Sequence, residues 1–72
     1  MQGKEPMILT LNGKQESIDR PLSLDALIEA KGLCPEKIVV EHNFNIISRE
    51  DLAKIMLKDQ DTVEIISFVG GG

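Results

Sequence analysis

Hydrophobic and polar residues alternate along residues 7–11, the pattern of a half-buried β-strand. The Asn-Gly pair at 12–13 accepts the positive φ angles of a type I′ turn, so residues 14–18 are predicted to return as the partner strand of a hairpin. A two-residue turn then places Glu16 opposite Leu9 on the apolar face. Either the second strand forms a sheet edge or a bulge shifts the register.

The pattern next changes to the period of a helix. Leu24, Leu27 and Ile28 follow the i, i+3, i+4 spacing of a single apolar stripe. Ser23 is a suitable N-cap residue, and Gly32 suits the left-handed position that follows a helix. These signals predict a helix of about two turns that covers one face of a sheet.

The second half of the chain alternates short extended segments with polar turns. Residues 38–42 are rich in β-branched side chains and predict a strand, and residues 46–47 predict a brief extended segment. Ser48 is predicted to cap a short helical turn over residues 49–53. Residues 58–61 are polar and predict a turn.

Residues 62–69 form the most apolar segment and are predicted to be the last strand. Apolar residues occupy both of its faces, which is typical of a strand inside a sheet. The simplest arrangement places it parallel to residues 7–11, with the helix across one face. This is an α+β, β-grasp (ubiquitin-like) layout, with a mixed sheet of four to five strands, one main helix and a short helical turn.

Length and composition narrow the class of protein. The 72 residues suffice for one domain, and the net charge is −4, which disfavours binding to nucleic acid. The chain has two Phe and no Trp or Tyr, so a base-stacking surface is not expected. Cys34 is the single cysteine, which fits a reducing compartment, and no apolar run approaches membrane-spanning length. We expect a small acidic cytoplasmic protein, monomeric on its own, with no membrane association.

We divide the chain into a flexible leader (1–6), a β-grasp domain (7–69) and a flexible C-terminal glycine tail (70–72). The leader is polar, and the tail follows the last predicted strand directly. Terminal segments of this kind are often disordered.

No catalytic or metal-binding constellation is apparent. His42 has no nucleophile near it in the sequence and is interpreted as a structural or exposed residue. Cys34 has no CxxC partner or companion ligands, so zinc is not expected, and it is interpreted as an ordinary loop thiol. The segment 59–61 lacks the other ligands of a calcium loop and is interpreted as a turn. We expect no catalytic residues, no metal and no cofactor.

The glycines Gly70, Gly71 and Gly72 remain as the segment with plausible chemistry. Three extended residues reach roughly 10 Å, and a chain without Cβ atoms passes through narrow openings. A carboxylate is a poor electrophile and requires activation, typically as an acyl-adenylate. A thin glycine arm would carry the Gly72 carboxylate into an ATP site that a folded domain cannot enter.

From residue 7 onward the chain resembles the ThiS family, the sulfur carriers of thiamine biosynthesis. Two segments carry the likeness: residues 40–49, VEHNFNIISR, and residues 59–72, DQDTVEIISFVGGG. Family members commonly read VERNxxIVPR and DGDxVEIVxxVGGG in these places. Gln60 replaces the usual glycine, which affects the geometry of that turn, and Ser48 replaces the usual proline, which affects the start of the helical turn.

The resemblance implies a β-grasp fold and a cycle of sulfur transfer. An E1-like enzyme (ThiF) would adenylate Gly72 with ATP, and sulfur from a cysteine-desulfurase relay would convert it to a thiocarboxylate. Thiazole synthase (ThiG) would receive that sulfur, and the carrier itself would not be an enzyme. Gly70 and Gly71 would provide reach, and Phe68 and Val69 are predicted to contribute to docking, although Phe68 could equally be a core residue.

Three alternatives remain at this point, one of which is a protein-modifying ubiquitin-like tag. A MoaD-type small subunit of molybdopterin synthase would share the fold and the terminal thiocarboxylate. A non-catalytic β-grasp interaction module would share the fold alone.

Overall fold

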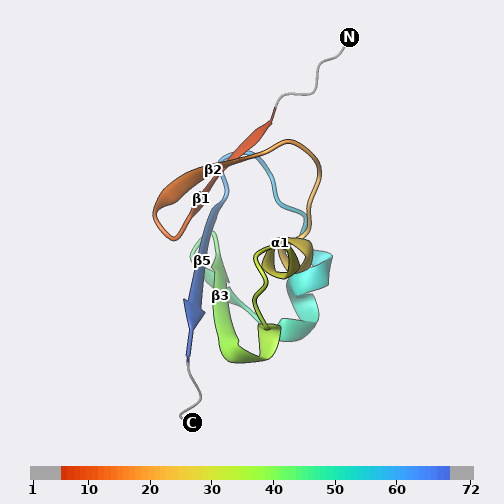
Figure 1. Cartoon of the computed structure of the whole chain (residues 1–72), viewed down its shortest axis with the longest axis vertical. Helices are drawn as coiled ribbons and strands as arrows, with labels where there is room; N and C mark the ends of the chain where they lie inside the picture. Colours follow the sequence, from red (N-terminus) through yellow and green to blue (C-terminus); the bar gives the residue numbers. More distant parts are fainter. Residues whose placement is uncertain (1–5, 69–72) are drawn as a thin grey trace.

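The computed structural model describes residues 6–68 (Figure 1). The predicted leader, apart from Pro6, lies outside the described residues, as do Val69 and the glycines 70–72. The strands are β1 (Met7–Leu11), β2 (Lys14–Ile18), β3 (Ile38–His42), β4 (Asn45–Ile47) and β5 (Thr62–Ser67). The helices are α1 (Leu24–Ala30) and two short 3₁₀ segments, η1 (Pro35–Lys37) and η2 (Arg49–Lys54).

The β1–β2 hairpin has the predicted register. Asn12 and Gly13 have φ angles of 50° and 82°, as a type I′ turn requires, and Leu9 pairs with Glu16 without a bulge. Of the two explanations for Glu16, the sheet edge is correct, because β2 is an outer strand. The carboxylate of Glu16 accepts two hydrogen bonds of 2.8 Å from Lys31 Nζ, so the apolar face ends there in an ion pair.

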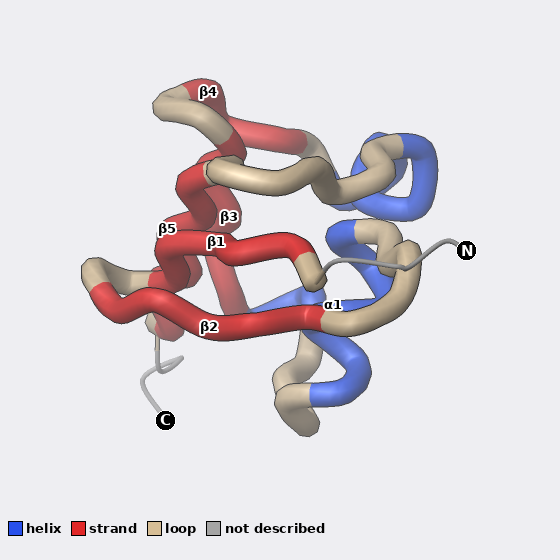
Figure 2. Tube along the Cα trace, turned by 90° about the horizontal axis from the view of Figure 1, so that it is seen from above, coloured by secondary structure: helices blue, strands red, loops and turns tan. Residues whose placement is uncertain are grey.

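The five strands form one mixed sheet in the order β2-β1-β5-β3-β4. The predicted position of β5 is confirmed: it lies in the centre, parallel to β1 and antiparallel to β3. The helical segments lie on one side of the sheet (Figure 2). The fold is therefore the predicted β-grasp arrangement, with one sheet face covered and the other open.

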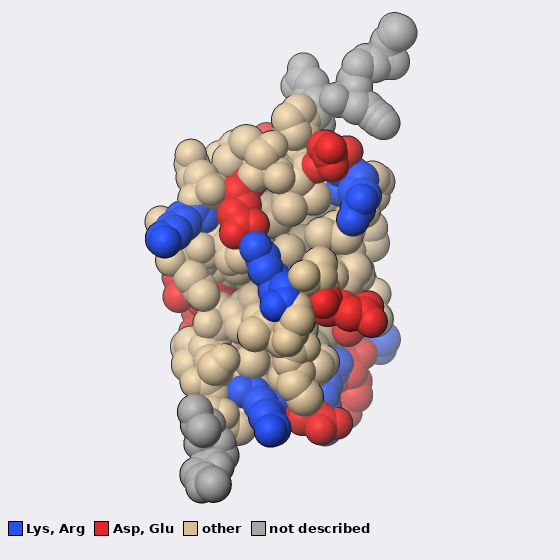
Figure 3. Space-filling model, viewed as in Figure 1, with Lys and Arg blue, Asp and Glu red and all other residues tan. Residues whose placement is uncertain are grey.

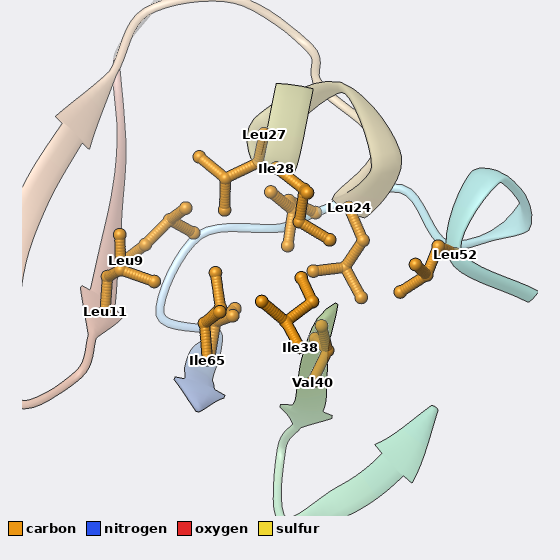
Figure 4. Close-up of a cluster of buried hydrophobic side chains, with 11 residues drawn as sticks. Leu9, Leu11, Leu24, Leu27, Ile28, Ile38, Val40, Leu52 and Ile65 are labelled. Atoms are coloured by element: carbon orange, nitrogen blue, oxygen red, sulfur yellow. The ribbon is translucent and has the colours of Figure 1, made fainter. Parts of the chain in front are cut away.

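The core lies between the sheet and α1. The inward side chains of β1, β3 and β5 meet the apolar stripe of the helix (Figure 4). Leu9, Leu24, Leu27, Ile28 and Val63 are fully buried. This aliphatic core holds β5 rigidly at the centre of the domain.

Both ends of α1 have the predicted caps. The side chain of Ser23 accepts a hydrogen bond of 3.1 Å from the backbone N–H of Ala26. Gly32 follows the helix with φ 73°, a conformation that glycine adopts without a Cβ clash.

Ser48 occupies the predicted N-cap position, but the predicted hydrogen bond from its side chain to a backbone N–H is wrong. Residues 49–54 form a 3₁₀ helix, and the Ser48 hydroxyl donates to Asp51 Oδ2 at 3.2 Å instead of capping a backbone N–H. In a 3₁₀ turn the N–H of residue i+3 bonds to the backbone carbonyl of residue i, so the N–H that the hydroxyl would cap is already used. The backbone N–H of Asp51 instead bonds to Ser48 O at 2.9 Å.

The turn before β5 has the geometry that glycine adopts most easily. Gln60, in place of the usual glycine, has φ 74°, and its backbone N–H donates to Ile8 O at 2.8 Å. The substitution therefore retains a left-handed turn that ties β5 to β1. β5 itself ends at Ser67, shorter than the predicted strand that included residue 68.

Candidate functional site

The end of β5 is the point from which the glycine segment departs. After the last strand residue, Phe68 N–H still donates to Lys37 O at 3.0 Å, which continues the bonding between β5 and the start of β3. The structure thus fixes the backbone up to Phe68. The predicted sulfur-carrying residue Gly72, and with it Gly70 and Gly71, lies outside the described residues.

Side chains along β5 alternate between the core and the open sheet face. Val63 and Ile65 are buried against the core, whereas Ile66 and Phe68 project outward. Phe68 is 49% exposed, so it is not a core residue. Of the two predicted docking residues, Phe68 lies on the surface, and Val69 lies outside the described residues.

The outward residues of β5 have neighbours of the same kind on the adjoining strands. Val39 pairs with Ile66, and Glu41 pairs with both Glu64 and Ile46. Paired residues share a sheet face, so the strand register assembles one surface. We call it the open-face patch, and its members are Val39, Glu41, Ile46, Glu64, Ile66 and Phe68.

Within this patch, Glu41 and Glu64 are directly opposite each other. Like charges in this position repel one another across strands. Ile66 and Ile46 remain largely exposed beside them. The patch therefore combines an apolar surface with two carboxylates, a combination suited to a partner with apolar and cationic side chains.

A polar network at the start of β5 was not predicted from the sequence. Asp61 is 7% exposed, and its carboxylate accepts hydrogen bonds from Lys58 N–H at 2.9 Å and from Asn43 Nδ2 at 3.1 Å. His42 Nε2 lies 2.8 Å from Asp61 Oδ2. Asn43 Oδ1 in turn accepts from Thr62 N–H at 2.9 Å. The network joins the β3–β4 turn to the start of β5.

The network also changes the acidity of Asp61. Burial raises the pKa of this carboxyl group, but the hydrogen bonds from His42, Lys58 and Asn43, with the charge of the imidazole, outweigh burial. The pKa of Asp61 is therefore lower than its ordinary value. His42 has the structural role predicted for it, as the donor to a buried carboxylate.

Within residues 6–68, no group of three or more His, Cys, Asp or Glu side chains is arranged to hold a metal ion. Cys34 is exposed and unpaired with another cysteine, in agreement with its interpretation as a loop thiol. No helix in the described part of the chain is long and apolar enough to cross a membrane. On the face shown in Figure 3, Lys and Arg side chains lie among Asp and Glu side chains.

A β-grasp sheet whose central strand leads into a glycine segment defines the class of ubiquitin-like carrier domains. The model of the ThiS family matches residues 9–72. The chain therefore belongs to the ThiS family, and the predicted family and fold are confirmed. The match favours this family over the MoaD alternative.

Individual relatives agree with the family assignment. The sulfur carrier protein ThiS of Bacillus subtilis is 35% identical over 66 residues, which cover 90% of this chain and 100% of that protein. The crystal structure of ThiS from Geobacter metallireducens is similar with a TM-score of 0.78 and 36% identity, over 92% of this chain and 100% of that one. A thiazole synthase of Magnetococcus marinus is 33% identical over 66 residues. The chain spans 20% of the length of that relative.

Proposed function

We propose that Gly72 is the residue on which this chain carries sulfur for thiazole formation. A ThiF-like enzyme adenylates the Gly72 carboxylate with ATP and releases pyrophosphate. Hydrosulfide then displaces AMP and leaves a thiocarboxylate. Where the donor is a persulfide from a desulfurase relay, a thiol must reduce the acyl disulfide that forms first.

One observation carries the proposal: the central strand of the sheet leads directly into the glycine segment. β5 is bonded on one side to β1 and on the other to β3, and its bonding extends to Phe68. A rigid domain with a narrow, side-chain-free extension matches the task of delivering a carboxylate into an enclosed site. The family match extends through residue 72, so it includes all three glycines.

The chain itself acts in this proposal as a co-substrate and not as a catalyst. It needs no cofactor of its own, because ATP is bound by the adenylating enzyme. The two partners are that enzyme and a thiazole synthase of the ThiG type. Similarity to a segment of two thiazole synthases supports the second partner, since carrier-like and synthase sequences occur there in one chain. ATP-dependent activation is consistent with a cytoplasmic location.

The open-face patch is the proposed docking surface for the adenylating enzyme. It runs along one face of β5 as far as Phe68, the last described residue before the glycine segment, so a partner bound there would lie close to the start of that segment. Burial of its apolar side chains would supply affinity, and a cationic partner residue would relieve the repulsion between Glu41 and Glu64.

The loading reaction tests the proposal directly. Incubation of the chain with the adenylating enzyme, ATP and sulfide is expected to add the mass difference of one oxygen-to-sulfur exchange. Fragmentation should locate this difference at Gly72. An unchanged intact mass, with an enzyme shown to be active on another carrier, would reject the proposal.

Phe68→Ser tests the docking surface. We expect the KM of the adenylating enzyme for the chain to rise about tenfold, because an exposed aromatic anchor of an interface is lost. The thermal midpoint should stay close to that of the wild type, since the side chain is outside the core. KM is measured by pyrophosphate release at varied carrier concentration.

Phe44→Ser is the matched control. Phe44 is 80% exposed in the β3–β4 turn, at the end of β3 away from the glycine segment. It undergoes the same chemical change and should leave KM unaltered. Equal effects of the two substitutions would contradict docking on the open-face patch.

A further inference from the structure

The second half of β5 has one side that no neighbouring strand covers. β1 pairs with β5 only at Thr10–Thr62 and Leu11–Val63, after which β1 ends in the hairpin turn. β5 continues past that turn (Figure 1). On the opposite side, β3 pairs with β5 up to Ser67. The sheet is therefore incomplete beside the last residues of β5.

The hydrogen-bond pattern identifies the backbone groups on this open side. Asn12 N–H donates to Val63 O at 2.9 Å, and Ile65 N–H donates to Asn12 Oδ1 at 2.7 Å. Odd-numbered residues of β5 thus direct their backbone groups toward β1, because successive residues of a strand alternate. The carbonyl of Ile65 and the N–H of Ser67 point the same way, and neither has a hydrogen-bond partner among residues 6–68.

A groove of about 350 Å³ lies along this open side. Leu11 and Asn12 of the hairpin line one wall, and Ile65 and Ser67 of β5 line the other. Leu33, at the end of the segment that follows α1, contributes a further apolar side chain. The groove has exposed backbone groups on one wall and apolar side chains beside them, as sites for strand addition do.

The groove is also the site of a local positive charge in an acidic chain. Lys14, Lys31 and Glu16 line it, and the Glu16 carboxylate is already bonded to Lys31 at 2.8 Å. Lys14 is exposed and has no ion-pair partner in the described part of the chain. The ammonium group of Lys14 is thus available to a carboxylate, although the whole chain has a net charge of −4.

We propose that this groove receives an extended segment of the adenylating enzyme, which adds as a strand beside Ile65 and Ser67 and places a carboxylate side chain at Lys14. The inference rests on the proposed function and adds a second contact to it, lined by Ile65 and Ser67, which alternate along the chain with the open-face residues Ile66 and Phe68. An added strand would hydrogen-bond to the Ile65 carbonyl and the Ser67 N–H. It would lie next to the residues from which the glycine segment departs and so align that segment.

Hydrogen exchange of the Ser67 amide gives the first test. In the free chain this amide should exchange rapidly, and in the complex with the adenylating enzyme, formed without ATP, its exchange should slow at least tenfold. The Leu27 amide, bonded to Ser23 O in α1 and away from both proposed surfaces, is the internal reference and should change little. Unchanged exchange at Ser67 in the complex would overturn the proposal.

Two substitutions test the backbone and charge contacts separately. Ser67→Pro removes an N–H that has no partner in the described structure, and Lys14→Glu reverses the charge. Each is expected to raise the Kd for the adenylating enzyme about tenfold. Lys58→Glu, an equal charge change on an exposed residue before the other end of β5, should leave Kd unaltered.

The outcomes separate this inference from the proposed function. If the wild-type chain is loaded with sulfur but both variants bind as tightly as Lys58→Glu, the groove is not a docking site and the proposed function stands. If the wild-type chain is not loaded by the active enzyme, the proposed function fails and this inference fails with it. If Ser67→Pro does not fold, the Kd of Lys14→Glu and the exchange rate of the wild-type Ser67 amide determine whether the groove is a docking site.

Discussion

A chain that lacks Gly72 is expected to lose sulfur loading by at least about a hundredfold while retaining its fold. Removal of one residue retracts the terminal carboxylate by roughly 3.5 Å. A displacement of about 1 Å of a reacting group already costs on the order of a hundredfold in rate. Loading is measured by intact mass after incubation with the adenylating enzyme, ATP and sulfide.

Two controls accompany this variant. Its thermal midpoint should equal that of the full chain, because the core residues lie between Leu9 and Ile65. Gly72→Ala retains the length and the carboxylate and adds one Cβ, so its loading should fall between those of the wild type and the deletion. A deletion variant that is loaded at the wild-type rate would rule out Gly72 as the reacting residue.

Asp61→Ala is expected to lower the free energy of unfolding by about 3 kcal/mol, because three donors around the buried carboxylate lose their acceptor. A chain of this length has a total stability of roughly 4–11 kcal/mol, so the loss is a large part of it. The thermal midpoint should fall by roughly 12–24 °C. Thermal unfolding followed by circular dichroism measures the change.

Asp19→Ala provides the matched control for this variant. Asp19 is an exposed residue that follows β2, and its side chain has no hydrogen bond or ion pair within residues 6–68. Its removal should alter stability by less than about 0.5 kcal/mol. Similar losses in the two variants would contradict the special role of the buried network.

The same carboxylate makes stability dependent on acid. Because the pKa of Asp61 is lower in the folded chain than its ordinary value of 3.8, the charged group stabilises the fold fully above that value. This contribution is lost as pH falls through the pKa of the folded state. Asp61→Asn should therefore lack the stabilisation that the charged carboxylate provides. The urea concentrations at the unfolding midpoints of the wild type and of Asp61→Asn should converge below pH 4. A constant difference across the acidic range would contradict this assignment.

Much of the fold follows from local signals in the sequence. The Asn-Gly pair determines a turn of two residues, and this turn length determines the register of β1 and β2, including the position of Glu16. The apolar residues of β5 predict its central place, which is correct, although Ile66 and Phe68 remain exposed on the open sheet face. Ser23 and Gly32 define the ends of α1 through their caps.

Other features depend on contacts that no local pattern contains. The network around Asp61 draws its donors from His42, Asn43 and Lys58, which lie up to 19 residues away in the sequence. The sequence around Asp61 shows only a polar turn. The sequence likewise does not determine whether Phe68 is buried or exposed, because its exposure depends on which sheet face the helix covers.

The surfaces of the proposed function also differ in how far the sequence predicts them. The glycines are visible in the sequence because of their composition and their place after an apolar strand. The open-face patch and the groove beside β5 are not visible there, since strand pairing creates the first and the early end of β1 creates the second. Both surfaces are consequences of topology.

The central position of β5 also has a mechanical consequence. A partner that draws the glycine segment into its active site pulls on β5 along the strand axis. The hydrogen bonds between β5 and its neighbours run across that axis, so the pull loads the five register pairs with β3 together, in shear. The same strand pulled sideways would break those bonds one at a time. The described part of β5 is therefore expected to bear tension along its axis without separating from β3 one residue at a time.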